Sequence, residues 1–366
     1  MDNDIPENEK AKHPSGDPED ATPGIEEMGK GNVEAEDVHC VTGPLTQTAT
    51  MLEPLLTLEN VCKEFPMNDG TTFVALKNLS LTVKDIKGKP QIISLLGPSG
   101  SGKTTALRII AGLDAPSSGC VMIANGKGMR SVKVGDVGVV FQRYPLFEDL
   151  NVLNNLVVPA TNAGMSKAAA KEKALRYLDE FNLVQQGLAW PVQLSGGQRQ
   201  RIGIARALAL QPKFIVCDEA VSALDVSIQA QILNLLRDIQ KRFNLTYLFI
   251  AHDLAVVKHI SDRVAVMYLG EIVEEADTEE IFSRPLHPYT QALLAAIPVA
   301  RPHAKRLNAK LEGDVPTPIN PPSGCRFHTR CPIAIEECKI TKPPLVEITR
   351  GHRVACIRTD VSAERI

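Results

Sequence analysis

The sequence has few aromatic residues and no long apolar run. Only 4% of its 366 residues are Phe, Trp or Tyr, with a single Trp. No apolar stretch approaches the roughly 20 residues that a helix needs to span a bilayer. The acidic N-terminal part also lacks the apolar segment of a secretory signal peptide. We therefore expect a protein that is soluble when alone and has no membrane-spanning segment.

Basic residues are scarce near the N-terminus. Residues 1–40 contain twelve Asp and Glu against three Lys, a net charge of −9, whereas the whole chain sums to −3. The segment has no aromatic residue and few aliphatic ones, so it cannot bury enough apolar surface to offset the entropy cost of ordering. We interpret residues 1–54 as a disordered acidic tail; a docking or regulatory segment is the alternative.

The rest of the chain has no internal repeat and no stripe of Lys and Arg. Subtracting −9 from −3 leaves a net charge of +6 beyond residue 40. Proteins that bind the phosphate backbone of DNA or RNA concentrate basic residues on one face or along one helix. We therefore expect no nucleic acid partner.

Residues 55–283 alternate short apolar runs with helical patterns. This alternation is typical of βαβ units, so we predict an α/β fold with a parallel sheet. A helix with one apolar face is predicted over Ser227–Phe243, and Ser166 is predicted to cap another helix that runs to about Phe181. The predicted buried strands are short and rich in β-branched or aromatic residues. They are Ile92–Leu96, Val137–Phe141, Phe214–Cys217 and Tyr247–Ile250.

A glycine-rich loop separates the first of these strands from a predicted helix over Lys103–Ala111. Its glycines let the backbone wrap around a phosphate chain, while successive N–H groups and the helix N-terminus supply positive potential. We expect Lys103 to reach the β- and γ-phosphates of a nucleotide and Thr104 to ligate Mg²⁺. The loop consists of Gly97, Pro98, Ser99, Gly100, Ser101, Gly102, Lys103 and Thr104, followed by Thr105.

The strand Phe214–Cys217 leads directly into two carboxylates, Asp218 and Glu219. At the carboxyl end of a parallel strand, an Asp can hold Mg²⁺ through water. A Glu beside it can polarise the water that attacks the γ-phosphate. Without the phosphate-binding loop, a surface acidic pair after a core strand would explain this pattern equally well.

A second glycine-containing turn comes between the loop and the acidic strand. It contains Ser195, Gly196, Gly197 and Gln198 after Leu194, and it precedes a helix that runs through Arg199–Leu210. A serine hydroxyl and glycine amides at a helix N-terminus form a second phosphate cradle. This segment resembles the signature motif of ABC ATPases, in which it contacts the γ-phosphate bound by a partner subunit.

Other elements of that family follow in the expected order, as resemblance implies. Gln142 resembles the glutamine that touches Mg²⁺ and senses the membrane partner, and Asp225 resembles the aspartate that communicates across the dimer. His252 resembles the switch histidine that holds the γ-phosphate and orients water. Phe65 falls where the family places an aromatic ring on adenine, although an ordinary core Phe is the alternative.

The resemblance covers residues 55–283 and implies a P-loop NTPase domain of the ABC type, with a helical subdomain over about 143–210. It also implies phosphoryl transfer to water, in which Lys103, Mg²⁺ and backbone amides position and neutralise ATP. Each active site then needs two subunits. A homodimer and a pair with a related chain are both compatible with the sequence, because every motif is present in this one chain.

Four of the eight cysteines lie in the Pro-rich segment 284–366. Their spacings of five, six and seventeen intervening residues differ from the paired C-x2-C knuckles of zinc fingers. Thiolates are soft metal ligands, so the group needs an explanation. The cysteines are Cys325, Cys331, Cys338 and Cys356.

The stretch from Asn320 to Pro332 resembles the C-terminal domain of oligopeptide and dipeptide importer ATPases. In that family, cysteines in this arrangement bind a [4Fe–4S] cluster, and four thiolates suit such a cluster. We interpret 284–366 as a small C-terminal domain of this type. Zn²⁺ and unligated thiols are the alternatives.

Resemblance to peptide importers is strongest in the second half of the chain. It implies an ATPase at the cytoplasmic face of the inner or plasma membrane, with separate permease subunits and, indirectly, a substrate-binding protein. The stretch Phe141–Phe147 looks more like ATPases that import nitrate, sulfonate or amino acids. An importer of another small solute, such as nickel, is therefore the alternative. A soluble ABC ATPase acting on DNA or ribosomes is disfavoured, because such proteins usually carry two ATPase modules or a long coiled coil.

Overall fold

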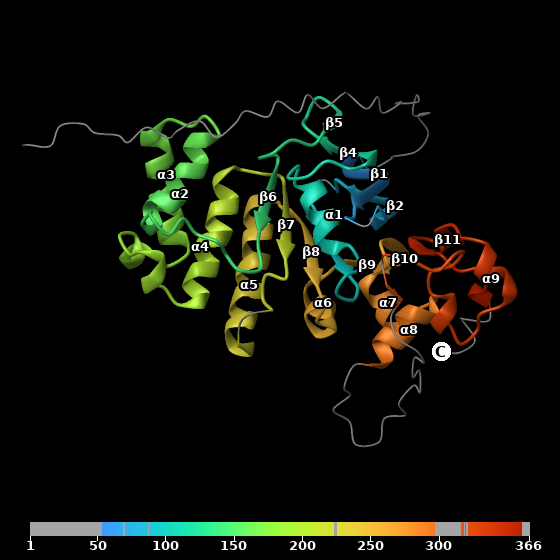
Figure 1. Cartoon of the computed structure of the whole chain (residues 1–366). Coiled ribbons are helices and arrows are strands. Elements are labelled where there is room, and N and C mark those ends of the chain that lie inside the picture. Colours follow the sequence, from blue (N-terminus) through green and yellow to red (C-terminus); the bar gives the residue numbers. More distant parts are fainter. Residues whose placement is uncertain are drawn as a thin grey trace, which may run out of the picture. The chain divides into compact units, whose positions relative to one another are not determined.

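Two sheets organise the part of the chain that the computed structural model describes (Figure 1). It describes residues 53–360 without 69, 87, 223, 224, 297–315, 318 and 320. The predicted acidic tail therefore lies outside the described residues, apart from its last two positions.

The larger sheet has eight strands in the order β11-β12-β10-β9-β3-β8-β7-β6. The five strands from β9 to β6 are parallel, whereas β10, β12 and β11 run antiparallel to their neighbours. The strands are β3 (Ile92–Leu96), β6 (Val137–Val140), β7 (Phe214–Asp218), β8 (Thr246–Ala251), β9 (Arg263–Tyr268), β10 (Glu271–Asp277), β11 (Val346–Thr349) and β12 (His352–Val354).

The four predicted strands are confirmed as β3, β6, β7 and β8, and no end differs by more than one residue. They are apolar throughout because both faces of the sheet are covered. Ile93 and Leu95 of β3 belong to a core with helix α1 and the smaller sheet. Ile92 and Leu96 point into a second core, formed with the helices that follow β6.

The smaller sheet is antiparallel, in the order β2-β1-β4-β5. Its strands alternate buried and exposed positions only in part, with several register shifts between β1 and β2, so the sequence pattern did not identify them. The strands are β1 (Pro54–Pro66), β2 (Thr72–Lys84), β4 (Ser118–Ala124) and β5 (Met129–Ser131).

Helices α2, α3 and α4 pack against one another within the region predicted as a helical subdomain (Figure 1). Ser166 caps α3 as predicted, because its side chain accepts a hydrogen bond from the Ala169 N–H at 3.3 Å. The predicted helix ending at Phe243 is confirmed as α5 and begins one residue earlier, at Val226. The helices are α1 (Lys103–Ile110), α2 (Val152–Asn162), α3 (Lys167–Glu180), α4 (Gly196–Ala209), α5 (Val226–Phe243), α6 (Leu254–Ile260), α7 (Thr278–Ser283), α8 (Pro288–Ala295) and α9 (Glu336–Ile340). In the described part of the chain, none combines the length and apolar character that crossing a bilayer requires.

The predicted domain boundary after residue 283 falls at the end of α7, but the chain beyond it returns to the larger sheet. Strand β12 pairs with β10, so β11 and β12 extend the same sheet. A buried ion pair reinforces this pairing: His352 Nε2 lies 2.7 Å from Glu274 Oε1, and both side chains are at most 1% exposed. The cysteine-containing segment therefore shares its backbone hydrogen bonds with the sheet that carries the glycine-rich loop.

Candidate functional site

The predicted site residues follow four parallel strands at the same edge of the sheet. Gly97 follows β3, Glu219 follows β7, His252 follows β8, and Gln142 comes two residues after β6. Parallel strands end at a common edge, which is where ligands bind in open α/β sheets. The topology therefore gathers side chains that are up to 155 positions apart in the sequence.

The glycine-rich loop turns tightly between β3 and α1. Gly102 is the N-cap of α1 with φ 97°, and no side chain caps the helix. A Cβ atom on Gly97 would lie 2.4 Å from the Met267 carbonyl oxygen, and one on Gly102 would lie 2.6 Å from that of Ala75. Glycine is thus required at both positions, and the first N–H groups of α1 have no side-chain acceptor.

Lys103 lies inside this loop and is only 7% exposed. Its Nζ donates to the carbonyl oxygens of Gly97 and Pro98, both at 2.8 Å. Burial lowers the pKa of Lys103, and the nearby carboxylates of Glu219 and Asp218 oppose this shift. An ammonium group is therefore held among backbone dipoles beside two acids, while Thr104 follows it with an exposed side chain.

The two carboxylates at the end of β7 have different environments. Asp218 is half-buried, and burial, followed by repulsion from Glu219, raises its pKa. Glu219 has φ 45°, a left-handed conformation, and its N–H donates to the Ile250 carbonyl at 3.0 Å. A non-glycine residue in this conformation carries backbone strain, which often accompanies functional sites.

Glu219 contacts both other polar groups that the sequence placed near the γ-phosphate. Gln142 Nε2 donates to Glu219 Oε2 at 2.8 Å, and His252 Nδ1 lies 3.3 Å from the same oxygen. Gln142 also lies 3.3 Å from the Ser222 hydroxyl. Gln142 and His252 are exposed, so this group lines an open cleft in which water and an anionic ligand could meet.

Two buried residues that sequence analysis missed support Glu219 from behind. The side chains of Tyr144 and Gln200 both donate to the carbonyl oxygen of Ala220, the next residue in the chain. Gln200 is fully buried in α4, among apolar residues at helical spacing such as Gly203 and Ile204. A Gln on the apolar face of a helix was the signal available in the sequence.

The serine-glycine turn opens α4. Ser195 Oγ accepts from the Gln198 N–H at 3.3 Å, and Gln198 Oε1 accepts from the Ser195 N–H at 2.9 Å, which forms a capping box. Ser195 and Gly196 are exposed, and Gly197 packs close to Ile228. Among the described residues, no hydrogen bond joins this turn to the glycine-rich loop, so one chain does not bring the two cradles together.

Phe65 and Asp225 each have a local partner. Phe65 is half-buried and stacks on Phe73 with ring centroids 6.1 Å apart, and Lys63 Nζ lies 5.2 Å from its centroid. Its strand pairs with β2, which approaches the glycine-rich loop at Ala75. Asp225 caps α5 by accepting from the Ile228 N–H at 3.0 Å, a bond that lowers its pKa. The two preceding residues lie outside the described part.

The four C-terminal cysteines line one pocket together with Phe327 and Ile333. Burial raises the pKa of Cys325 to about 12, and the other three thiols contribute in the same direction. Burial also raises the pKa of Cys356. The pocket gathers four sulfur atoms, yet nowhere in the described residues do three or more His, Cys, Asp or Glu side chains form a ready-made metal site.

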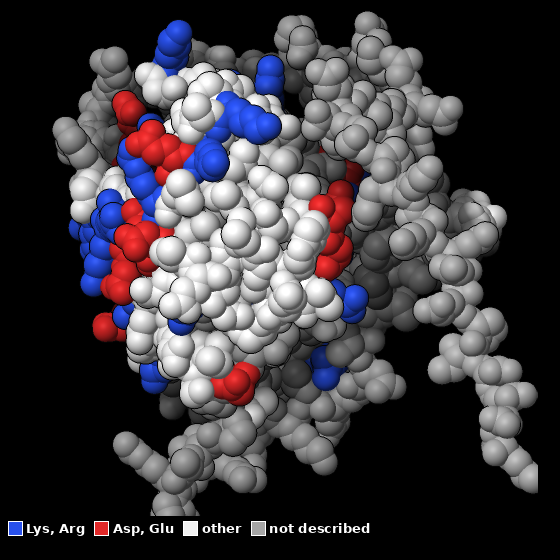
Figure 2. All heavy atoms as spheres, turned by 90° about the vertical axis from the view of Figure 1, so that its left-hand side faces the viewer, with Lys and Arg blue, Asp and Glu red and all other residues white. Residues whose placement is uncertain are grey.

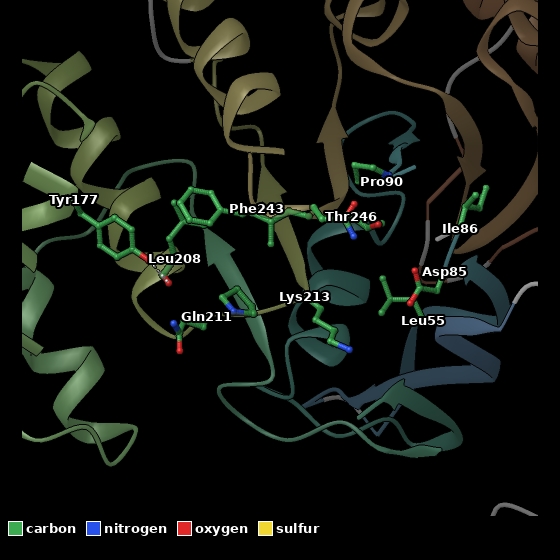
Figure 3. Close-up of a pocket in the computed structure, with 13 residues that line it drawn as sticks. Leu55, Asp85, Ile86, Pro90, Tyr177, Leu208, Gln211, Lys213, Phe243 and Thr246 are labelled. Carbon is green, nitrogen blue, oxygen red and sulfur yellow. Dashed lines mark hydrogen bonds between the residues drawn. The ribbon is translucent and has the colours of Figure 1, made fainter. Parts of the chain in front are cut away.

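A separate cavity of about 350 Å³ lies at the opposite edge of the sheet. Figure 3 shows Tyr177 of α3 and Phe243 of α5 on one side of it and Lys213, which precedes β7, on the other. Thr246 begins β8, and Pro90 lies just before β3, so these are the amino ends of the strands. The cavity is therefore distinct from the predicted nucleotide site.

Comparisons with known proteins agree with the geometry of the carboxyl edge. Residues 76–222 match the ABC transporter family, and residues 273–338 match the oligopeptide/dipeptide transporter C-terminal region. A putative peptide import ATP-binding protein of Brucella ovis is 44% identical over 319 residues, which cover 84% of this chain and 99% of the relative. The oligopeptide transport ATP-binding protein AppF of Bacillus subtilis is 42% identical over 331 residues, covering 84% and 98%. Among solved structures, the dimeric bacterial ABC transporter cassette MJ0796 is 33% identical with a TM-score of 0.54, over 61% of this chain and 98% of that one.

Proposed function

The chain belongs to the ATP-binding proteins of peptide-importing ABC transporters, and on this premise we propose that it hydrolyses Mg-ATP to drive peptide uptake through separate membrane subunits. One observation carries the proposal: Glu219 lies within hydrogen-bond reach of Gln142 and His252, at the sheet edge where Lys103 is buried in a glycine-rich loop. This arrangement suits hydrolysis of a nucleotide, because it combines a phosphate cradle with a carboxylate that can polarise water.

Each residue has a distinct part in this mechanism. The amides of Gly97–Thr104 and the Lys103 ammonium bind the phosphates, and Phe65 stacks on adenine. Thr104, Gln142 and Asp218 would hold Mg²⁺, which neutralises phosphate charge when bound. Glu219 accepts a proton from the attacking water, and His252 contacts the γ-phosphate and keeps that water in line. Positioning and charge neutralisation therefore account for most of the catalysis.

The second half of each active site comes from a partner subunit. The turn formed by Ser195, Gly196, Gly197 and Gln198 presents an exposed helix N-terminus that suits the γ-phosphate bound by the other chain. Asp225 lies at the start of α5, where it can face the partner. A homodimer and a pair with a related ATPase fit equally well. The similar cassette MJ0796 is itself described as dimeric.

A groove beside Gln142 suits the membrane subunits. It has a volume of about 620 Å³ and is lined by apolar side chains that include Leu113, Leu146 and Phe147. Figure 2 shows a broad uncharged area on the side of α2 and α3, with charged residues gathered near its margin. We place the permease on this groove, and hence the chain at the cytoplasmic face of the membrane, because the groove adjoins the glutamine that contacts Glu219.

Replacing Phe147 with Asp should weaken permease binding, because a charge would replace an aromatic ring in an apolar groove. Loss of one well-placed aromatic contact costs about 2 kcal/mol or more. We expect ATP binding by the purified chain to stay unchanged, while permease-stimulated hydrolysis in proteoliposomes falls by about tenfold or more. Co-purification with the permease gives an independent measurement.

Phe243 offers a matched control for this experiment. It is 39% exposed with Arg242 lying 5.4 Å from its ring centroid, whereas Phe147 is 45% exposed with Arg206 at 5.7 Å. Phe243 lies beside the cavity at the opposite edge of the sheet (Figure 3). Phe243→Asp should leave the stimulation intact. Equal loss in both variants, or none in Phe147→Asp, would contradict the placement of the permease.

The transported solute can be tested directly. With permease and a candidate binding protein present, oligopeptides should stimulate ATP hydrolysis, and nickel, anions and single amino acids should not. Stimulation by one of these other solutes, without a response to peptides, would replace peptide import with the alternative importer. Hydrolysis that responds only to ribosomes or DNA would reject a transport role.

We further propose that Cys325, Cys331, Cys338 and Cys356 bind a [4Fe–4S] cluster. The support is their common pocket and the chemistry of four thiolates, which suits such a cluster. The cysteines must lose their protons and draw closer when the cluster binds, because burial favours the neutral thiol in its absence. Zn²⁺ bound by the same thiols is the alternative.

Protein purified without oxygen should be brown and contain about four iron atoms per chain. Cys331→Ser should lose the colour and most of the iron, whereas Cys62→Ser should keep both, because Cys62 lies on β1 outside the pocket. Iron content and the visible absorption spectrum are the measurements. A colourless product that carries zinc in place of iron would reject the cluster.

A further inference from the structure

The turn between β9 and β10 packs directly on the glycine-rich loop. The Gly270 N–H donates to the Ser101 carbonyl at 2.9 Å, and the Gly270 carbonyl accepts from the Lys77 N–H at 3.2 Å. A Cβ atom on Gly270 would lie 2.6 Å from the Ala75 carbonyl oxygen. Leu269 and Gly270 both have positive φ, of 44° and 81°, as a two-residue turn of this kind requires. The position of this turn therefore sets the position of the loop backbone.

Arg326 holds this turn from the cysteine-containing segment. Its Nη1 donates to the Leu269 carbonyl oxygen, and its Nε lies 2.8 Å from Glu271 Oε1. One guanidinium group thus contacts the residues on both sides of Gly270. Arg326 is only 5% exposed, and Glu271 is 15% exposed, so water competes little for these bonds. Charge-assisted bonds in such surroundings are among the stronger ones in proteins.

The same segment builds the cysteine pocket. Arg326 follows Cys325, whose N–H donates to the Cys338 carbonyl at 2.8 Å. Phe327 packs edge-to-face on Tyr268, the last residue of β9, with centroids 5.4 Å apart. The cysteine pocket is therefore joined to the β9–β10 turn by packing and by Arg326 together.

We propose that Arg326 is a positioning residue for ATP binding: it fixes the β9–β10 turn, and through Gly270 and Ser101 it fixes the phosphate-binding loop. The inference rests on the proposed ATPase function. It assigns to the cysteine-containing segment a role in nucleotide affinity, in addition to any group that the cysteines bind. Arg326 touches neither nucleotide nor water in this role.

The test compares Arg326→Gln and Arg326→Lys with the parent chain, using the full protein. Arg326→Gln should raise the Kd and KM for ATP about tenfold, which corresponds to about 1.4 kcal/mol, and change kcat by less than about threefold. Arg326→Lys should have an intermediate effect, because one ammonium group keeps the charge but not the forked contact. Hydrogen exchange at the Gly270 amide should speed up in both variants, and this readout does not depend on hydrolysis.

Arg353→Gln is the matched control, because Arg353 pairs with Glu275 on the same strand β10, at 3.3 Å, away from the turn. It should lower thermal stability slightly and leave ATP affinity unchanged. If Arg326→Gln fails to fold, Glu271→Gln removes the same ion pair with a smaller change in shape and should raise the Kd in the same direction. Folded Arg326→Gln with parental ATP affinity and parental exchange at Gly270 would overturn the inference. A parent chain that does not bind ATP would instead refute the proposed function.

Discussion

Glu219→Gln is expected to reduce the ATP hydrolysis rate by about 10²–10⁴-fold, the usual contribution of a general base. Glutamine keeps the size of the side chain and its contacts with Gln142 and His252, but it cannot accept a proton from water. ATP binding should therefore persist. Because hydrolysis is what separates the two subunits in the proposed mechanism, the variant should accumulate as an ATP-bound dimer. Phosphate release measures the first effect, and light scattering with size-exclusion chromatography measures the second.

Glu172→Gln provides the control for the loss of one carboxylate. Glu172 is exposed on α3, where it pairs only with Arg176 one turn away. Its replacement should leave hydrolysis and oligomeric state as in the parent chain. Hydrolysis at the parental rate by Glu219→Gln would show that another group activates the water.

Lys103→Ala is expected to raise the Kd for ATP by about 100-fold, the upper end of what one hydrogen bond to a charged group contributes. The ammonium is already buried in the loop, so little ordering entropy is lost when it moves from the Gly97 and Pro98 carbonyls to phosphate oxygens. Its loss also removes a positive charge beside two carboxylates, which leaves the site with a net repulsion for an anion. Titration calorimetry with ATP measures the change.

Lys173 is a suitable control, because it resembles Lys103 in its surroundings but lies on α3. Its Nζ donates to the Ala209 carbonyl at 3.0 Å, and burial lowers its pKa as well. Lys173→Ala should cost some thermal stability and leave ATP affinity unchanged. Parental affinity in Lys103→Ala would reject the assignment of the phosphate-binding loop.

Patterns between near neighbours were enough to predict much of the fold and of the candidate site. The apolar runs of β3, β6, β7 and β8, and the cap at Ser166, depend on residues within one element, so the sequence shows them directly. The small sheet was missed because its strands are interrupted by register shifts and have no uniform pattern. The predicted roles of Phe65 and Asp225 need a nucleotide or a second chain and remain predictions.

The sequence by itself determined which chemistry the chain carries, because a loop, a strand end and a helix start have local signatures. Tertiary structure alone decided how these parts support one another. Gln200 reaches the carbonyl beside Glu219 from 20 residues away, and Arg326 reaches Leu269 from 57 residues away. No periodicity encodes such contacts, since they exist only once the helices pack on the sheet and the C-terminal strands join it.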